Sequence, residues 1–381
     1  MERFSFAVTN MLTKEEKIAR LRIIRSDSVG PTTFWNIIKV YGSGIRALQA
    51  IPFLSKTSSK PIKLCSEENL KKEFDGLKAL GARLIFLEDE LYPPLLRTLP
   101  DPPPTLTFFG NKENTLSFYK KTLVAVVGAR NSSIHANKFC SSICADLGKN
   151  DVVVVSGLAR GVDTYAHVGS IMNGTIAIMA GGADIVYPPE NLSLYKEIAK
   201  TGAIFAEMPV GTSPQPQLFP RRNRIIAGMT SGTLVIEAAE NSGSLITAKI
   251  ALEYNREVFA VPGCPLDPRS VGCNSLIRDG ATLVQSSKDV LECIEGRRII
   301  HQHALHENGE PFIAKITEEN LEKTRKKILN SLSSVPITID ELISCIKVSP
   351  QEVLTALLEL ELSSKISRLH GQRVCLALTV R

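Results

Sequence analysis

The 381-residue sequence has few aromatic side chains and no strong excess of either charge. Aromatic residues make up 6% of it, with one tryptophan, and 45 lysines and arginines stand against 39 aspartates and glutamates. A net charge of +6 is too small for a protein that coats nucleic acid through bulk charge. Residues 121–290 carry 15 basic and 14 acidic side chains, so an anion site in this region requires local geometry.

Cysteine pairs of the kind that bind metals are missing. None of the eight cysteines belongs to a Cys-x-x-Cys pair, and none has a histidine partner at zinc-binding spacing. We therefore expect reduced, mostly buried thiols, no metal and no other cofactor. The three histidines of the HQHALH stretch (301–306) lie in a polar, acidic context, which favours a solvated linker over a metal site.

Long apolar runs are absent as well. No stretch approaches the roughly 20 apolar residues that are needed to span a bilayer. The apolar part of residues 1–17 is too short for a secretory signal. The sequence thus predicts a cytoplasmic protein with no membrane span.

Glycine and proline divide the amino-terminal third of the chain. The Gly30-Pro31 turn precedes apolar residues at helical spacing, which indicates a small helix-hairpin-helix or SAM-like domain over residues 1–60. Such a hairpin can offer backbone N–H groups to a phosphate, although a packing or partner role is favoured. The proline-dense stretch 92–111 is unsuited to a helix or a central strand, so residues 61–121 are expected to form an extended linker and lead-in.

Seven short, apolar, β-rich runs follow from Thr122 onward, and helical segments separate most of them. This alternation predicts a Rossmann-like, doubly wound, mostly parallel sheet over residues 122–295. After a polar linker at 296–320, three helical patterns and two strands joined at Gly371 predict a winged-helix domain over 321–381. Its recognition helix carries three glutamates and no basic residue, which favours a protein contact over duplex reading.

The first strand of the α/β domain ends in VAVVGARNSS. Ligands of open parallel sheets bind beyond the carboxyl ends of the strands, and a helix N-terminus attracts anions. Gly128, Arg130 and Ser133 are therefore predicted to form a phosphate-binding loop. The loop lacks the glycines of a dinucleotide fingerprint, and no GxxxxGK[ST] motif occurs in the sequence.

Further candidates for DNA binding lie at a strand end, in an arginine cluster and at a helix start. They are Ser156, Gly157, Arg222, Asn223, Arg224, Ser242, Gly243 and Ser244. Phe219 precedes the arginines and either stacks on a base or packs in the core; the sequence does not choose between these roles. Asp163 is better explained as a helix N-cap than as a catalytic acid.

These motifs resemble the DNA-processing protein A family. The runs VVSGLARGVDTYAH, FPRRNRIIAGMTSGTLVIEAAENSGSLITA and GCNSLIRDGA occur in the family's order, and the resemblance covers the whole α/β domain. It implies a cytoplasmic bacterial protein, not an enzyme, that binds and protects incoming single-stranded DNA in natural transformation. It further implies that the protein loads the RecA recombinase and forms a homodimer through the α/β domain. The family motifs assign DNA binding to Gly128, Arg130, Ser133, Ser156, Gly157, Arg222, Arg224 and Ser244.

A Rossmann-like nucleoside-monophosphate phosphoribohydrolase is the alternative. The run SGTLVIEAAE places Glu237 and Glu240 at a strand end, where a carboxylate could stabilise an oxocarbenium-like transition state. Such enzymes need a glycine pair before the Gly-Thr step, and this sequence has Thr230 and Ser231 there.

Overall fold

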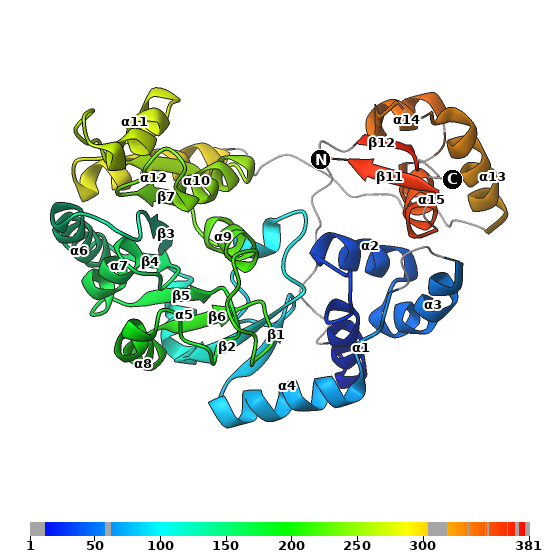
Figure 1. Cartoon of the computed structure of the whole chain (residues 1–381), viewed down its shortest axis with the longest axis horizontal. Coiled ribbons are helices and arrows are strands. Elements are labelled where there is room, and N and C mark those ends of the chain that lie inside the picture. The colour runs from blue at the N-terminus through cyan, green and yellow to red at the C-terminus, as the bar shows by residue number, and fades with distance from the viewer. Residues whose placement is uncertain are drawn as a thin grey trace. The chain divides into compact units, whose positions relative to one another are not determined.

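The computed structural model describes residues 12–57, 62–303 and 318–377, the last range without residues 334, 347, 349, 364 and 370–372. The chain divides into two compact units (Figure 1). The larger unit contains Glu68–Glu307, and the smaller one combines Thr13–Glu67 with Asn308–Arg381.

The larger unit is built on a nine-stranded sheet with the order β1-β2-β6-β5-β4-β3-β7-β8-β9. Its strands are β1 (Arg83–Phe86), β2 (Thr105–Gly110), β3 (Thr122–Val127), β4 (Val152–Ser156), β5 (Thr175–Met179), β6 (Ala203–Ala206), β7 (Gly232–Val235), β8 (Glu257–Ala260) and β9 (Thr282–Leu283). Strands β3 to β9 pair in parallel, whereas β1 and β2 add antiparallel pairs beyond β6. The predicted doubly wound, mostly parallel sheet is confirmed.

The central strands are apolar along their length because both faces of the sheet are covered. Every residue of β3 and β4 is buried. Branched side chains such as the four valines of 152–155 suit an extended, packed strand. A strand that is buried on both faces reads as a continuous apolar run, and the seven runs found in the sequence are β3 to β9.

The order of the strands reverses at β3. Strands β4, β5 and β6 follow one another on one side of β3, and β7, β8 and β9 follow on the other. Right-handed crossovers then place α6, α7 and α8 on one face of the sheet and α9 and α10 on the other. The carboxyl ends of β3 and β7 therefore border a topological switch point, where open α/β sheets bind ligands.

Most of the helices that cover the sheet connect successive parallel strands (Figure 1). They are α6 (Ile134–Lys149), α7 (Val162–Ser170), α8 (Leu192–Thr201), α9 (Leu218–Gly228), α10 (Gly243–Glu253) and α11 (Val271–Arg278), and α12 (Ser287–His303) follows the last strand, β9. Helices α6 and α7 pack against each other, as do α9 and α10.

Residues 61–121 differ from the extended linker and lead-in that we expected. They contain α4 (Glu67–Leu80), β1, β2 and α5 (Lys112–Phe118), and the two strands complete the sheet beside β6. The prolines at 102–104 lie outside regular structure, immediately before β2 begins. They therefore remove no hydrogen bond from the strand. The prolines exclude regular structure only at their own positions and not in the residues on either side.

The amino-terminal part of the smaller unit contains α1 (Lys14–Ile24), α2 (Pro31–Tyr41) and α3 (Gly44–Thr57). Gly30 is the N-cap of α2 and Pro31 occupies its first turn, as the sequence predicts.

A carboxylate from α1 closes the start of α3. Glu16 accepts hydrogen bonds from the N–H groups of Gly44 at 2.6 Å and Ile45 at 3.1 Å, and Arg20 donates to it at 2.7 Å. Burial raises the pKa of Glu16, but the bonds from Gly44, Arg20 and Ile45 outweigh this and leave the pKa below its usual value. The chain itself thus supplies the anion at this helix N-terminus.

The carboxyl-terminal part of the smaller unit has the predicted winged-helix pattern. It contains α13 (Glu318–Ser331), β10 (Ile337–Thr338), α14 (Ile339–Ile346), α15 (Pro350–Leu362), β11 (Ile366–Leu369) and β12 (Arg373–Leu376). Thr338 and Glu341 form a capping box: each side chain accepts the other residue's N–H, at 3.2 and 3.0 Å. The predicted turn residue Gly371 lies outside the described residues.

Helix α12 extends into the stretch that we expected to be a linker, residues 296–320. It continues to His303, so the first part of that stretch is helical, and residues 304–317 lie outside the described part of the chain. Within the described ranges, no helix is both long enough and apolar enough to cross a membrane.

Candidate functional site

A cleft of about 1020 Å³ opens at the switch point, beyond the carboxyl ends of β3 and β7. Its walls come from the loop after β3, the starts of α7, α9 and α10, and the loop before α11. Eight of the predicted DNA-binding residues line this switch-point cleft: Gly128, Arg130, Phe219, Arg222, Asn223, Ser242, Gly243 and Ser244. The other four do not line it: Ser133, Ser156, Gly157 and Arg224.

Gly128 allows the loop after β3 to pass close to α7. A Cβ atom at this position would lie 2.6 Å from the Val162 side chain and 3.1 Å from the Glu237 carbonyl oxygen. The next residue, Ala129, donates its N–H to that same carbonyl at 2.6 Å. The close approach fixes the loop and leaves Arg130 exposed at the cleft.

The sequence predicts a phosphate-binding site at the start of α6, but in the structure the polar groups of Ser133 are bonded within the chain. The Ser133 hydroxyl caps the helix by accepting the Ala136 N–H at 3.1 Å. The Ser133 N–H in turn donates to the Glu237 carboxylate at 2.8 Å. Glu237 follows β7, which pairs with β3, and its carboxylate therefore fills the position to which the helix dipole would draw a phosphate.

Glu237 is also the acid on which the phosphoribohydrolase alternative depends. One oxygen, Oε2, accepts the Ser133 N–H, and the other, Oε1, lies 4.0 Å from Arg269 Nε. The residue is 7% exposed. A buried carboxylate that is bonded in this way joins two loops and is poorly placed to stabilise a developing cation on a substrate.

The start of α10 presents a different arrangement to the cleft. The Ser242 hydroxyl accepts the Ser244 N–H at 3.4 Å and lies 2.8 Å from the Ser244 hydroxyl. A Cβ atom on Gly243 would meet nothing within 4 Å. Hydroxyl donors, open space and the helix dipole together suit an oxyanion, and no carboxylate in the described part of the chain is bonded there.

Arg222 lies beneath the cleft and only its edge reaches it, since the side chain is 7% exposed. Its guanidinium donates to the carbonyl oxygens of Gly157 and Ile178, and Nη1 is 4.0 Å from Asp163. Burial lowers the pKa of Arg222, and the Asp163 carboxylate opposes that shift. Arg222 therefore contributes positive potential from below.

The position of Arg222 explains why Ser156 and Gly157 do not line the cleft. The Ser156 hydroxyl is buried and donates to the Val126 carbonyl at 2.7 Å. The Gly157 N–H donates to Asp163 at 3.2 Å, and a Cβ atom on Gly157 would overlap the Arg222 guanidinium. Both residues were predicted to contact DNA; in the structure Gly157 accepts a hydrogen bond from Arg222, and Ser156 is bonded to the neighbouring strand β3.

Asp163 is not the N-cap that we expected. Gly161 occupies the N-cap position of α7, and Asp163 lies one residue inside the helix, where its carboxylate also accepts the Ala159 N–H at 3.3 Å. Burial raises the pKa of Asp163 and the neighbouring Arg222 lowers it. His167, on the next turn, is fully buried, and burial lowers its pKa to about 3, so its ring is neutral at pH 7.

Arg224 points away from the cleft. It forms an ion pair with the buried Glu207 and donates to the Asp101 carbonyl at 3.2 Å. Residues two positions apart on a helix lie on opposite sides, so Arg222 and Arg224 cannot both face the same ligand. Arg221, three positions before Arg224, also approaches Glu207, at 3.8 Å.

Phe219 forms a stacked pair with Arg130. The Arg130 guanidinium carbon lies 4.5 Å from the centre of the Phe219 ring, and the ring is neither fully exposed nor part of the core. Tyr187 meets the same ring edge-on with the centroids 6.2 Å apart, and it is 48% exposed.

Tyr187 and Arg269 line the cleft and were not predicted. Each lies in a loop between regular elements, Tyr187 after β5 and Arg269 before α11. Arg269 follows no glycine- or serine-rich motif, whereas Tyr187 closely follows the Gly181-Gly182 pair beyond β5, a signal that could have led to it.

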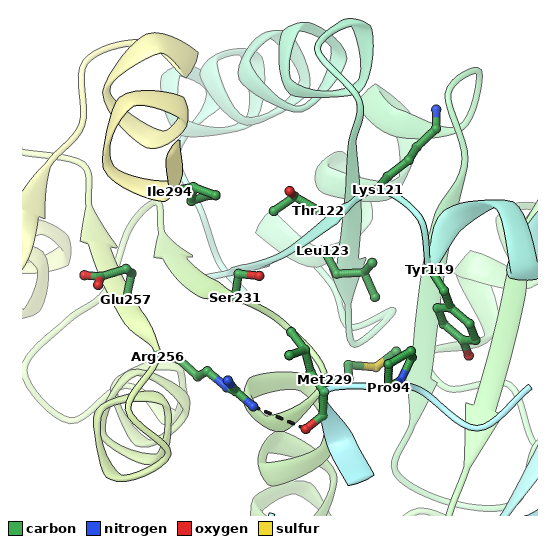
Figure 2. A pocket seen from close by; sticks show the side chains of 11 residues that line it. Pro94, Tyr119, Lys121, Thr122, Leu123, Met229, Ser231, Arg256, Glu257 and Ile294 are labelled. Carbon is green, nitrogen blue, oxygen red and sulfur yellow. Dashed lines mark hydrogen bonds between the residues drawn. The ribbon is translucent and has the colours of Figure 1, made fainter. Parts of the chain in front are cut away.

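A second cavity, of about 330 Å³, lies at the opposite edge of the sheet, near the amino ends of β3, β7 and β8 (Figure 2). Its two cations are bound within the protein. Arg256 donates to the Leu95 carbonyl at 3.2 Å, and Lys121 pairs with Asp151 at 2.9 Å. Because parallel sheets bind ligands at the carboxyl edge, the switch-point cleft is the candidate site.

Comparison with known families covers nearly the whole described chain. Residues 83–295 match the family described as DNA recombination-mediator protein A. Residues 14–76 match the DprA-like N-terminal HHH domain, and residues 314–372 match the DprA winged helix domain.

Individual relatives agree with these matches. Protein Smf of Synechocystis sp. is 35% identical over 310 residues, which cover 75% of this chain and 78% of that protein. The DNA processing protein DprA of Streptococcus pneumoniae is 41% identical over 59% of this chain and 77% of its own length.

Two solved structures are similar in fold and sequence. The X-ray structure of DprA from Streptococcus pneumoniae has a TM-score of 0.61 and 31% identity, covering 74% of this chain and 98% of that one. DNA processing protein A from Helicobacter pylori, studied for its unique single-stranded DNA binding mode, has a TM-score of 0.51 and 26% identity. That match covers 56% of this chain and 97% of the other.

Proposed function

Because the chain belongs to the DNA recombination-mediator protein A family, we propose that it binds single-stranded DNA in the switch-point cleft. Binding is independent of base sequence and leaves the DNA uncut. The single observation that carries this proposal is the open start of α10, where Gly243 borders free space beside two serine hydroxyls.

The start of α10 is the proposed position of a DNA phosphate. The helix dipole and the open space at Gly243 favour an anion, and the Ser242 and Ser244 hydroxyls can donate hydrogen bonds to it. Arg130 supplies an exposed guanidinium from another wall, and Arg222 adds positive potential from below. Phosphate contacts of this kind position a strand without reading its sequence.

The Arg130–Phe219 pair is the proposed platform for a base. Phe219 supports one side of the guanidinium plane, so a base can stack on its other side or on the exposed Tyr187. Every base has a flat aromatic face, and stacking therefore tolerates any sequence. A duplex keeps its bases stacked inside, so this platform favours single strands.

The test is a binding titration of the full chain with labelled oligo-dT, a mixed-sequence oligonucleotide and a duplex of equal length, over a range of salt concentrations. We expect tight and similar binding of both single strands, weaker binding of the duplex, and a linear fall of log K with log salt. Equal affinity for duplex and single strands would contradict the proposal. A nuclease-protection assay on the bound oligonucleotide extends the test to protection of incoming DNA.

The family relationship also leads us to propose that the protein loads RecA onto the bound strand during natural transformation, in the cytoplasm. RecA assembly on single-stranded DNA can be followed with and without the protein. Faster assembly by wild type than by a variant that cannot bind DNA is the expected result. Equal rates would contradict the loading role and leave DNA binding intact.

A homodimer through the α/β domain is the remaining part of the proposal. Helices α10 and α11 and strand β9 all contact β8, and they expose the apolar side chains of Ile246, Leu252, Val271 and Leu283. Light scattering should show a dimer that Leu252→Asp or Leu283→Asp converts to a monomer. Val168→Asp, at an exposed apolar position on α7, is the matched control.

The enzyme alternative is not favoured. Family membership points to DNA binding, and the Glu237 carboxylate is engaged by Ser133. We propose that incubation with AMP releases no adenine. Turnover by wild type that Glu237→Gln abolishes would restore the phosphoribohydrolase interpretation.

A further inference from the structure

Arg269 is a cation in the switch-point cleft that the proposed DNA contacts do not include. It belongs to the short 3-10 turn η3 (Pro268–Ser270), and its side chain is 47% exposed. Its Nη2 and Nε atoms lie 2.8 Å and 3.1 Å from the two carboxylate oxygens of Asp267, which is a bidentate pair. A second carboxylate, that of Glu237, is 4.0 Å from Nε.

The backbone that carries Arg269 is fixed beside the residues that lead into α10. The Gly272 N–H donates to the Ala238 carbonyl at 2.8 Å. A Cβ atom on Gly272 would lie 2.8 and 2.9 Å from the carbonyl oxygens of Ala238 and Ala239. Ser270 is 8% exposed. The guanidinium can therefore change partner by rotating its side chain while its Cα stays in the wall of the cleft that also contains the start of α10.

The geometry of the Asp267–Arg269 pair is the geometry that a guanidinium adopts with phosphate. Arg binds carboxylate and phosphate oxygens through the same two parallel N–H groups. The hydrogen bonds from Arg269 lower the pKa of Asp267, so this carboxylate is charged at neutral pH. An exposed ion pair contributes little to stability, because water screens it, and a phosphodiester oxygen can replace the carboxylate at small cost.

We propose that Arg269 is a further DNA-binding residue, which Asp267 holds in the free protein and which transfers to a backbone phosphate when single-stranded DNA enters the cleft. This inference rests on the proposed function. It adds one phosphate contact to those at α10 and Arg130. It also makes Asp267 a restraint on binding, so that removal of its charge strengthens the complex.

The experiment compares wild type with Arg269→Ala, Arg269→Lys, Asp267→Asn and the double variant Asp267→Asn/Arg269→Ala. Affinity for oligo-dT is measured at several salt concentrations, together with the melting temperature of each protein. Lys149→Ala and Asp146→Asn provide matched charge changes, because this exposed pair (3.0 Å) is near the carboxyl end of α6 and outside the cleft lining.

Arg269→Ala should bind about tenfold more weakly and lose about 0.7 from the salt slope, the value for one phosphate on a single strand. Arg269→Lys keeps the positive charge and loses the two parallel N–H donors of the guanidinium. It should therefore retain the salt slope and bind about threefold more weakly. Asp267→Asn should bind about threefold more tightly. Its gain should shrink by at least half in the Arg269→Ala background, because Asp267 acts through Arg269.

The outcomes separate the two proposals. If wild type binds oligo-dT and Arg269→Ala binds equally well with an unchanged slope, Arg269 does not contact DNA and the cleft proposal stands. If Asp267→Asn binds more weakly at an unchanged melting temperature, Asp267 is no restraint and the transfer is refuted. A wild-type protein without affinity for oligo-dT refutes both proposals together.

Discussion

The starts of α6 and α10 have similar sequences and different partners. Each helix begins with a serine N-cap, Ser133 or Ser242, on a segment that leaves the parallel sheet. At α6 the Ser133 N–H is bonded to the Glu237 carboxylate, whereas at α10 Gly243 borders open space in the cleft. A helix N-terminus is available to an external phosphate only where the chain does not provide its own anion.

A third helix supports this distinction. Glu16 occupies the start of α3 through the N–H groups of Gly44 and Ile45, as Glu237 occupies the start of α6. Both carboxylates come from elements distant in the sequence. Among these three helix starts, the one at α10 is therefore the best candidate for binding a DNA phosphate. The comparison can be tested by placing a carboxylate at that start.

Gly243→Asp should have the largest effect on DNA binding. It places a carboxylate at the start of α10, as Glu237 does at α6, and the new side chain has room because a Cβ atom there meets nothing within 4 Å. Oligo-dT affinity should fall about 100-fold, since juxtaposed like charges cost several kcal/mol. The melting temperature should hold or rise, because an acidic residue at a helix N-terminus is stabilising.

Gly30→Asp is the matched control for that variant. Gly30 also starts a helix, also has open space around its Cβ position, and belongs to the amino-terminal helices. Unchanged oligo-dT binding would confine the effect to α10. A loss as large as that of Gly243→Asp would instead show that the α2 turn contacts DNA.

Arg130→Ala should have the next largest effect. Loss of the guanidinium removes the proposed charged contact to a phosphate and the cation that stacks on the Phe219 ring. Affinity should fall about tenfold and the salt slope by about 0.7. Arg130→Lys, which keeps only the charge, should recover the slope more fully than the affinity.

Arg224→Ala should have the smallest effect on binding and a clear effect on stability. It removes the close ion pair of Glu207, which is 7% exposed, and leaves the more distant Arg221 as the neighbouring cation, so the free energy of unfolding should fall by about 3 kcal/mol. Denaturant titration measures this loss, and Arg221→Ala, at a more exposed position, is the control. A tenfold loss of DNA affinity in folded Arg224→Ala would contradict the orientation described above.

Most of the fold could be predicted from the sequence because its signals are local. Each of β3 to β9 is a continuous apolar run between helical segments, and both terminal domains have recognisable helix starts such as Gly30-Pro31 and Thr338. Strands β1 and β2 were not predicted. The prolines at 102–104 suggested that all of residues 61–121 lack regular structure, whereas these prolines lie only in the loop before β2.

The site was harder to predict because its closing contacts are not local. Glu237 and Ser133 are 104 residues apart and meet only because β7 pairs with β3 in register. The orientation of Arg224, by contrast, could have been predicted from the spacing of apolar residues in the sequence. Arg222 has helical spacing with the buried Leu218, Ile225 and Ile226, whereas Arg224 lies on the other side of the helix.

The lengths of the two outermost strands bear on how copies of this protein can associate. β1 has four residues and β9 has two, so either edge of the sheet presents few main-chain groups to another chain. Strand addition at β9 would gain too few hydrogen bonds to hold two protomers. The proposed dimer therefore depends on side-chain contacts and not on main-chain pairing between strands. The same short edges make aggregation through the edges of this broad sheet unfavourable.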